Sequence, residues 1–87
     1  MTKYGDNSMT LAEALAARID ELLEQKNMTQ YRLSMESGAT NSMISEIRHC
    51  KNNSTALSVV YNIAQGFGMD LPDFFDSPLF RNGNIID

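Results

Sequence analysis

The sequence has few of the cysteine and histidine residues that stabilise many small folds through disulfides or bound metal. Its 87 residues include one cysteine and one histidine, which stand side by side as His49 and Cys50. A single cysteine cannot form an internal disulfide, and the pair offers too few ligands for a structural zinc ion, so we expect neither a metal nor a cofactor. No apolar run is long enough to cross a bilayer, and no basic segment leads into a hydrophobic signal core. These absences predict a cytoplasmic protein without a membrane partner.

Tryptophan is also absent, and only two prolines and five glycines interrupt a chain in which 43% of the residues are apolar. That composition is typical of one compact domain, and the length excludes most large enzyme folds. A chain of this size buries only about two-thirds of the surface that it exposes when unfolded, so a single core must stabilise it. Helices are the most economical way to build such a core, and we expect an all-α fold.

Charge is distributed unevenly along the chain, whose net charge is −4. Residues 1–25 carry two basic and five acidic side chains, and residues 52–87 carry one basic and four acidic. Residues 26–51 carry four basic and two acidic side chains. The total argues against a nucleic-acid partner, but the middle third has a positive surplus.

The first helix is predicted by its cap and its periodicity. Thr10 and Glu13 have the spacing of a capping box, which predicts a helix from there to about Lys26. Arg18 falls on the polar side of this helix, and the apolar side recurs at helical spacing. The apolar residues are Leu11, Leu15, Ile19, Leu22 and Leu23.

Two short helices follow, separated by a glycine. Thr29 is the predicted N-cap of the first, which must stop near Gly38 because glycine supplies the left-handed conformation that ends helices. Thr40 or Asn41 caps the second, which carries its two isoleucines inward.

Two more helices complete the prediction. Ser54 or Thr55 opens a longer helix, and Asp70, with a proline in the first turn, opens a last short one. The predicted buried side of the longer helix consists of Leu57, Val60, Tyr61, Ile63 and Ala64. Near the C-terminus, Asn-Gly at 82–83 is a hairpin signal between flanks too short to hold a hairpin alone.

The chain divides into a flexible N-terminal lead (1–9), a helical domain (10–76) and a C-terminal tail (77–87). The tail carries spare apolar groups. Two alternatives stay open for it: it forms a symmetric interface with a second copy, or it folds back over its own core.

A short helix, a glycine-containing turn and a second short helix form the helix-turn-helix arrangement. The run from Met28 to Ile47 resembles the phage repressor and Cro-type (XRE-like) helix-turn-helix DNA-binding family. The run from Leu57 to Phe75 stands in the places of that family's fourth and fifth helices. The resemblance implies a compact five-helix repressor-like domain whose second and third helices form the helix-turn-helix.

The resemblance also implies which residues contact DNA. Gln30, at the start of the first short helix, looks like the family's phosphate-contacting glutamine. Asn41 can pair in two places with adenine, and Glu46 can accept from a cytosine amine. The base-facing positions hold Thr40, Asn41, Ser42 and Glu46, with Ser45 nearby. The end of that helix and the following loop, where the family grips the backbone, hold Arg48, His49, Lys51, Asn52 and Asn53.

Each of these assignments has an ordinary alternative. Gln30 can be an exposed first-turn residue, and Thr40 and Asn41 can cap the helix with or without DNA. Glu46 can be a solvated surface charge.

Three positions depart from the family's pattern. Arg48 stands where many members have a glutamate, which suggests a reversed ion pair with Asp20 or Glu24. Cys50 replaces the loop glycine, so the backbone there must avoid the left-handed region or accept strain. The usual proline at the start of the fourth helix is absent.

We therefore predict a sequence-specific, repressor-like transcriptional regulator that reads the major groove of double-stranded DNA with the helix at about residues 41–49. Because two such helices about 34 Å apart read successive grooves, we expect a homodimer. No catalytic constellation occurs, so we expect neither an enzyme nor a small-molecule substrate. The alternative is a protein-protein interaction module on the same scaffold, with weak or no DNA binding, which the acidic total and Glu46 favour.

Overall fold

The computed structural model describes residues 9–51 and 54–86 of the chain. Its α-helices are α1 (Leu11–Gln25), α2 (Gln30–Ser37), α3 (Asn41–Arg48), α4 (Leu57–Gly66) and α5 (Leu71–Phe74), followed by the 3-10 turns η1 (Pro78–Phe80) and η2 (Asn82–Asn84). The only β-type pairing among these described residues is an isolated bridge between Met9 and Ile85. The all-α prediction is therefore confirmed.

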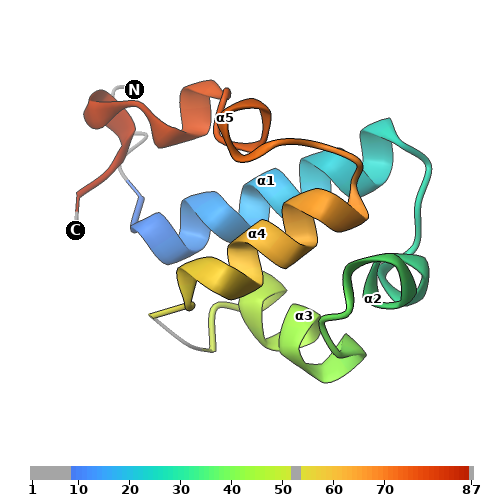
Figure 1. Cartoon of the computed structure of the whole chain (residues 1–87). Helices are drawn as coiled ribbons and strands as arrows, with labels where there is room; N and C mark the ends of the chain where they lie inside the picture. Colours follow the sequence, from blue (N-terminus) through green and yellow to red (C-terminus); the bar gives the residue numbers. More distant parts are fainter. Residues whose placement is uncertain (1–8, 52–53, 87) are drawn as a thin grey trace.

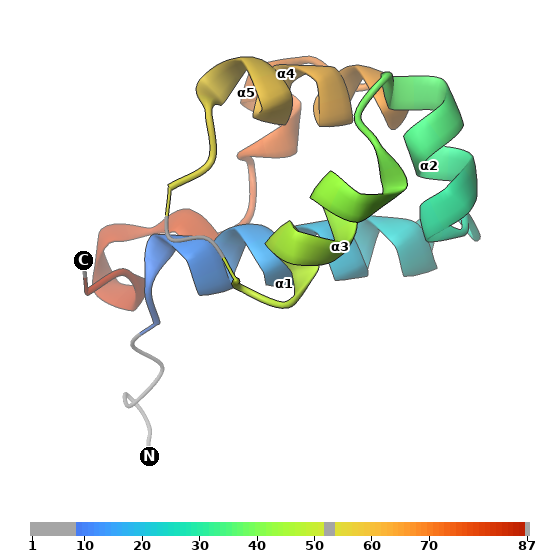
Figure 2. The same cartoon turned by 90° about the horizontal axis from the view of Figure 1, so that it is seen from below.

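The long helix α1 runs through the middle of the molecule, and the other elements are arranged around it (Figure 1). α3 packs against α1, and α2 packs against both α3 and α4. Seen from below, α3 lies in front of α1, while α4 and α5 lie together above them at the top of the view (Figure 2). None of the helices in the described ranges is both long and apolar enough to cross a membrane.

Threonine caps begin the first three helices, as predicted for the first two, and for the third the structure selects Thr40 over Asn41. The Thr10 hydroxyl accepts from the Glu13 amide at 3.1 Å, and the Glu13 carboxylate accepts from the Thr10 amide at 2.9 Å, which completes the capping box. Thr29 and Thr40 each accept from the backbone amide three residues later, at 3.0 Å. Gly38 ends α2 with φ +83°, a conformation that glycine adopts without strain.

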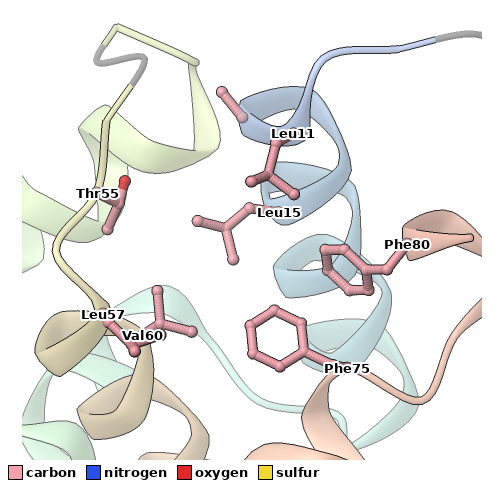
Figure 3. Close-up of a pocket in the computed structure, with 8 residues that line it drawn as sticks. Leu11, Leu15, Thr55, Leu57, Val60, Phe75 and Phe80 are labelled. Atoms are coloured by element: carbon pink, nitrogen blue, oxygen red, sulfur yellow. The ribbon is translucent and has the colours of Figure 1, made fainter. Parts of the chain in front are cut away.

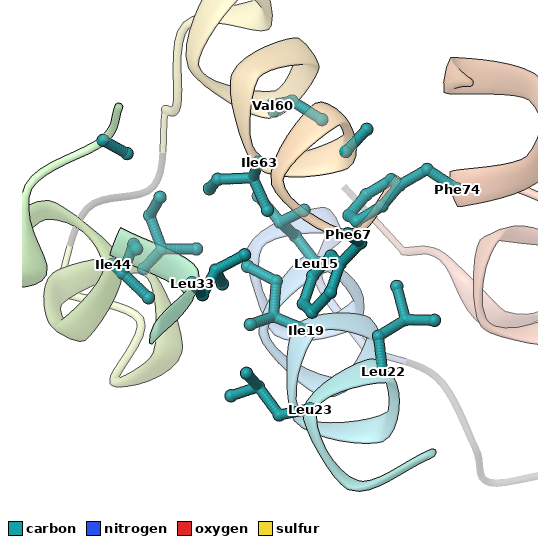
Figure 4. Packing of buried hydrophobic residues seen from close by; sticks show 13 residues of the cluster. Leu15, Ile19, Leu22, Leu23, Leu33, Ile44, Val60, Ile63, Phe67 and Phe74 are labelled. Carbon is teal, nitrogen blue, oxygen red and sulfur yellow. The ribbon is translucent and has the colours of Figure 1, made fainter. Parts of the chain in front are cut away.

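The core is built from one apolar face of every helix (Figure 4). Ile19 of α1, Leu33 of α2, Ile44 of α3, Ile63 of α4 and Phe74 of α5 are all fully buried. Helices as short as α2 and α3, with eight residues each, are marginal on their own in water. Their position and their persistence therefore depend on this shared core.

Three details of the predicted helices are wrong. α4 begins at Leu57 after Ala56, without a side-chain cap, so neither Ser54 nor Thr55 opens it. Leu57 and Tyr61 are 66% and 48% exposed, because the face of α4 that meets the core is formed by the residues three or four apart from Val60 to Phe67. The third exception is in α1, where Leu11 is 50% exposed at the first turn.

Arg18 is buried, although the periodicity assigned it to the polar side of α1. Its Nε donates to the Phe74 carbonyl at 2.7 Å and its Nη2 to the Asp73 carbonyl at 2.9 Å, while Nη1 pairs with Glu21 at 2.7 Å. The guanidinium thus satisfies carbonyl groups at the end of α5 and attaches that four-residue helix to α1.

The tail lies against the domain in its described part. η1 packs on α1, and the Phe80 ring meets the Phe75 ring edge to face with centroids 5.0 Å apart. The Asn-Gly pair forms a 3-10 turn rather than a hairpin, because Ile85, which follows that turn, bridges to Met9 instead of to its own flank. Residues 1–8 of the predicted lead lie outside the described residues, whereas Met9 donates to the Asn84 carbonyl at 2.7 Å.

Gly66 allows α2 and α4 to approach closely, and its replacement tests this packing. A Cβ built there would lie 2.7 Å from the Cβ of Ser37, and the clash involves backbone as well as side chain. We expect Gly66→Ala to lower the free energy of unfolding by about 1–3 kcal/mol in urea denaturation, because overpacking forces the helices apart. Gly83→Ala, which enters open space, is the matched control and should be near neutral.

Candidate nucleic-acid interface

The helix-turn-helix places one face of α3 in the core and the other in solvent. Ile44 and Ile47 point inward and are buried, and Ala39 in the preceding turn is 5% exposed. Asn41 and Glu46 are consequently exposed on the outer face. This orientation follows from helical geometry, since residues three and four apart share a face.

The outer face of α3 forms a shallow polar surface together with the start of α2 and the end of the following turn. We call it the α3 surface, and it is lined by Gln30, Asn41, Ser42, Ser45, Glu46, His49 and Lys51. The structure thus brings together most of the residues that the sequence predicted as a site. Asn52 and Asn53, which were predicted with them, lie outside the described residues. Thr40 precedes the surface, and its hydroxyl caps α3.

Gln30 and Asn41 are bonded to each other across the two helices. The Gln30 amide Nε2 donates to Asn41 Oδ1 at 2.8 Å and to the Asn41 carbonyl at 3.3 Å. Sequence reasoning assigned each residue a separate role and missed the bond, since no local pattern joins residues eleven positions apart. The helix-turn-helix geometry is what brings them together.

Arg48 makes the reversed ion pair that the sequence suggested. Its Nε donates to Asp20 Oδ1 at 2.6 Å, which selects Asp20 over Glu24, and its Nη1 donates to Gln30 Oε1 at 2.9 Å. The Arg48 side chain is 32% exposed and turned toward α1. It therefore supports the α3 surface from behind, although the sequence analysis grouped it with residues that grip the DNA backbone.

Lys51 is the cation of the α3 surface. It is exposed and forms no ion pair with any residue in the described ranges. Arg32, on α2, is instead paired with Glu36 at 2.9 Å. The His49 ring lies on the surface with Nδ1 held against the Ser45 carbonyl at 2.8 Å, which leaves Nε2 to face outward.

Cys50 accepts the strain that its replacement of glycine implied. Its φ is +54°, in the left-handed region, which costs a side-chain-bearing residue roughly 1–2 kcal/mol. Its thiol points toward the Ala12 carbonyl at 3.8 Å. The turn after α3 is thus attached to the start of α1 at a half-buried position.

A second hollow is apolar and lies apart from the α3 surface. It has a volume of about 140 Å³ and is bounded by the starts of α1 and α4 and by the tail (Figure 3). Leu15 and Val60 form its floor, and Leu57, Phe75 and Phe80 surround it. In the part of the chain that the structure describes, no cluster of three histidine, cysteine or acidic side chains could hold a metal ion.

The Asp20–Arg48 pair makes a testable contribution to stability. Arg48→Glu places a carboxylate against Asp20 and removes the bond to Gln30, so we expect the free energy of unfolding to fall by about 1–2 kcal/mol. Thermal denaturation followed by circular dichroism measures this. The swapped pair Asp20→Arg/Arg48→Glu should recover part of the loss. An unchanged melting temperature in Arg48→Glu would show that the pair does not stabilise the fold.

Comparison with known proteins agrees with the geometry. A family profile described as the Cro/C1-type HTH DNA-binding domain matches residues 18–78, which is more than half of the chain and includes α2 to α5. No curated protein and no solved structure shows a significant match. The family resemblance inferred from the sequence is confirmed, and the chain belongs to the Cro/C1-type helix-turn-helix DNA-binding family.

Proposed function

We propose that this protein is a sequence-specific transcriptional regulator of the repressor type, which inserts α3 into the major groove of double-stranded DNA. The observation that carries the proposal is the α3 surface, where polar side chains gather on the outer face of a helix whose inner face is buried. Such a protein acts by occupying DNA and needs no reaction and no small-molecule substrate. Its proposed location is the cytoplasm, where a repressor-like regulator meets its DNA.

The side chains of the α3 surface suit the edges of bases. Asn41 offers one donor and one acceptor, the pair that adenine matches in the major groove. The hydroxyls of Ser42 and Ser45 serve a base edge or a phosphate. Glu46 accepts from the amine of cytosine, so it favours a cytosine opposite its position. Its negative charge repels phosphates. Together these groups predict an operator that contains adenine and cytosine at neighbouring positions.

Phosphate contacts come from few groups. Lys51 supplies a cation, and Gln30 stands at the positive N-terminal end of α2. Thr40 and Asn52 flank this region in sequence and belong to the same proposed interface. Arg48 and Arg32 are engaged with carboxylates of their own chain. Because each neutralised phosphate adds affinity, a single copy should bind DNA weakly.

A protein-protein interaction module on the same scaffold is the second candidate. It is favoured by the net charge of −4 and by the exposed carboxylate of Glu46 on the α3 surface. The two candidates respond differently to ionic strength. Binding through phosphates weakens steeply with salt, whereas an apolar protein interface does not.

Selection from a random duplex library at low and at physiological salt tests the DNA-binding proposal. We expect a palindromic motif with one conserved adenine per half-site, whose conservation is lost in Asn41→Ala and kept in Asn62→Ala, an exposed change on α4. Lys51→Ala should weaken binding to all sequences and reduce the slope of log affinity against log salt by about 1. Arg81→Ala removes the same charge from the tail and is the matched control. Failure to enrich any motif, even at low salt, would favour the protein-partner candidate.

We propose further that two copies act together. Weak half-site binding needs a second recognition helix, and the apolar hollow of Figure 3 is bordered by exposed Leu11 and Leu57 and by Phe80 of the tail. An exposed group of large apolar side chains of this kind is typical of a symmetric contact. The tail contributes Phe80 to this surface, because the Phe80 ring packs against Phe75 of the domain.

Molecular mass in solution tests the homodimer. Leu57→Glu places a charge in the centre of the proposed contact, and we expect sedimentation equilibrium to show a monomer where the unmodified chain forms a dimer. Met35→Glu adds the same charge at an equally exposed apolar position on α2 and should stay dimeric. A monomeric unmodified chain at high micromolar concentration, in the presence of its selected duplex, would contradict the proposal.

A further inference from the structure

A chain of three hydrogen bonds connects α1 to the α3 surface. It begins at the Asp20 carboxylate, which accepts from Arg48 Nε at 2.6 Å. Arg48 Nη1 then donates to Gln30 Oε1 at 2.9 Å, and Gln30 Nε2 donates to Asn41 Oδ1 at 2.8 Å. The chain thus joins three helices and ends on the side chain proposed to read adenine. Its first member, Asp20, is on α1 and does not line the α3 surface.

These hydrogen bonds fix which way the side-chain amide groups of Gln30 and Asn41 are turned. A guanidinium only donates, so the Gln30 carbonyl oxygen must face Arg48 and the Gln30 amide nitrogen must face Asn41. That nitrogen also only donates, so the oxygen of Asn41 must turn toward Gln30. The amide nitrogen of Asn41 is therefore directed away from Gln30. Without the chain, the two ends of each amide group would be nearly equivalent in shape, and either could face the DNA.

We propose that Asp20 is a positioning residue for base recognition, acting on Asn41 through Arg48 and Gln30. The inference rests on the proposed DNA-binding function and adds the group that sets its specificity. In the orientation fixed by the chain, Asn41 Nδ2 donates to adenine N7, and the second lone pair of Oδ1 accepts from adenine N6. A flipped Asn41 amide would present the opposite pattern and lose this match.

The contacts of Arg48 explain why the chain of hydrogen bonds needs Asp20 at the end opposite Asn41. The Asp20 carboxylate makes a charge-assisted bond to Nε, which sets the plane of the guanidinium and hence the direction of Nη1. Arg48 without that anchor has the side-chain freedom to turn toward solvent or toward a phosphate. A lysine at this position could not hold both partners in one planar fork.

Asp20→Ala and Glu24→Ala form a matched pair for the test. Both remove one negative charge from an exposed position on α1, and alanine favours the helix in both. Both variants should bind random duplex DNA at least as tightly as the unmodified chain, because they reduce repulsion of phosphates. Only Asp20→Ala should lose discrimination between adenine and the other bases at the Asn41 position. A good bidentate pair discriminates by roughly 5- to 150-fold, and we expect a loss of about threefold to tenfold.

Two further variants keep the test independent of folding. Arg48→Lys retains the charge but not the fork, and should lose adenine preference in the same way as Asp20→Ala. In an Asn41→Ala background, Asp20→Ala should have no further effect on preference, because the side chain on which it acts is gone. Affinities are measured by fluorescence anisotropy with duplexes that differ at one base pair, well below the melting temperature of every variant.

The outcomes separate this inference from the proposed function. Unchanged preference in Asp20→Ala together with lost preference in Asn41→Ala would overturn the positioning role and leave the proposed function standing. A uniform loss of affinity for all four bases in Asp20→Ala would also overturn it, because that is the effect of a purely structural role. If the preference for adenine survives in Asn41→Ala, or if the unmodified protein binds no duplex, the assignment of base reading to Asn41 is refuted and the inference with it.

Discussion

The account depends on the anchoring of α3 in the core. An eight-residue helix has little stability of its own, so the burial of Ile44 and Ile47 against α1 and α2 determines both that α3 exists and which way it faces. Once those two side chains are inside, Asn41 and Glu46 must be outside. The close contact of α2 with α4 at Gly66 and the Arg18 contacts to α5 complete a frame that keeps this orientation.

Local signals predicted much of this frame from the sequence. The threonine caps, the left-handed Gly38 and the isoleucines of α3 act within one or two turns of chain, and all were found as expected. The predictions that failed depend on contacts between distant segments. Leu57 fits a helical apolar pattern, yet it is exposed because it is the first residue of α4 and lies at the border of the apolar hollow, outside the core. Arg18 is buried because the two carbonyl groups to which it donates lie more than fifty residues away, where no spacing rule applies.

The candidate site was predictable as a set of residues but not as a mechanism. Family resemblance and helix periodicity indicated Gln30, Asn41 and Glu46 individually. The Gln30–Asn41 bond and its continuation to Arg48 and Asp20 depend on the angle between three helices, which the sequence does not specify locally. Internal ion pairs also explain why the α3 surface carries little positive charge. The middle of the chain is basic, but Arg32 and Arg48 are paired with carboxylates of the same chain, which leaves Lys51 as the cation of that surface.

The central claim is that DNA meets this protein on the α3 surface. The most direct measurement is a nitrogen-15 nuclear magnetic resonance titration of the full chain with duplex DNA at low salt. The account predicts that the amide signals of Gln30, α3 and Lys51 shift together, while those of Asp70 and Leu71, which line neither the α3 surface nor the apolar hollow, stay in place. Shifts confined to α4, α5 or the tail, or the absence of any shift at low ionic strength, would contradict it.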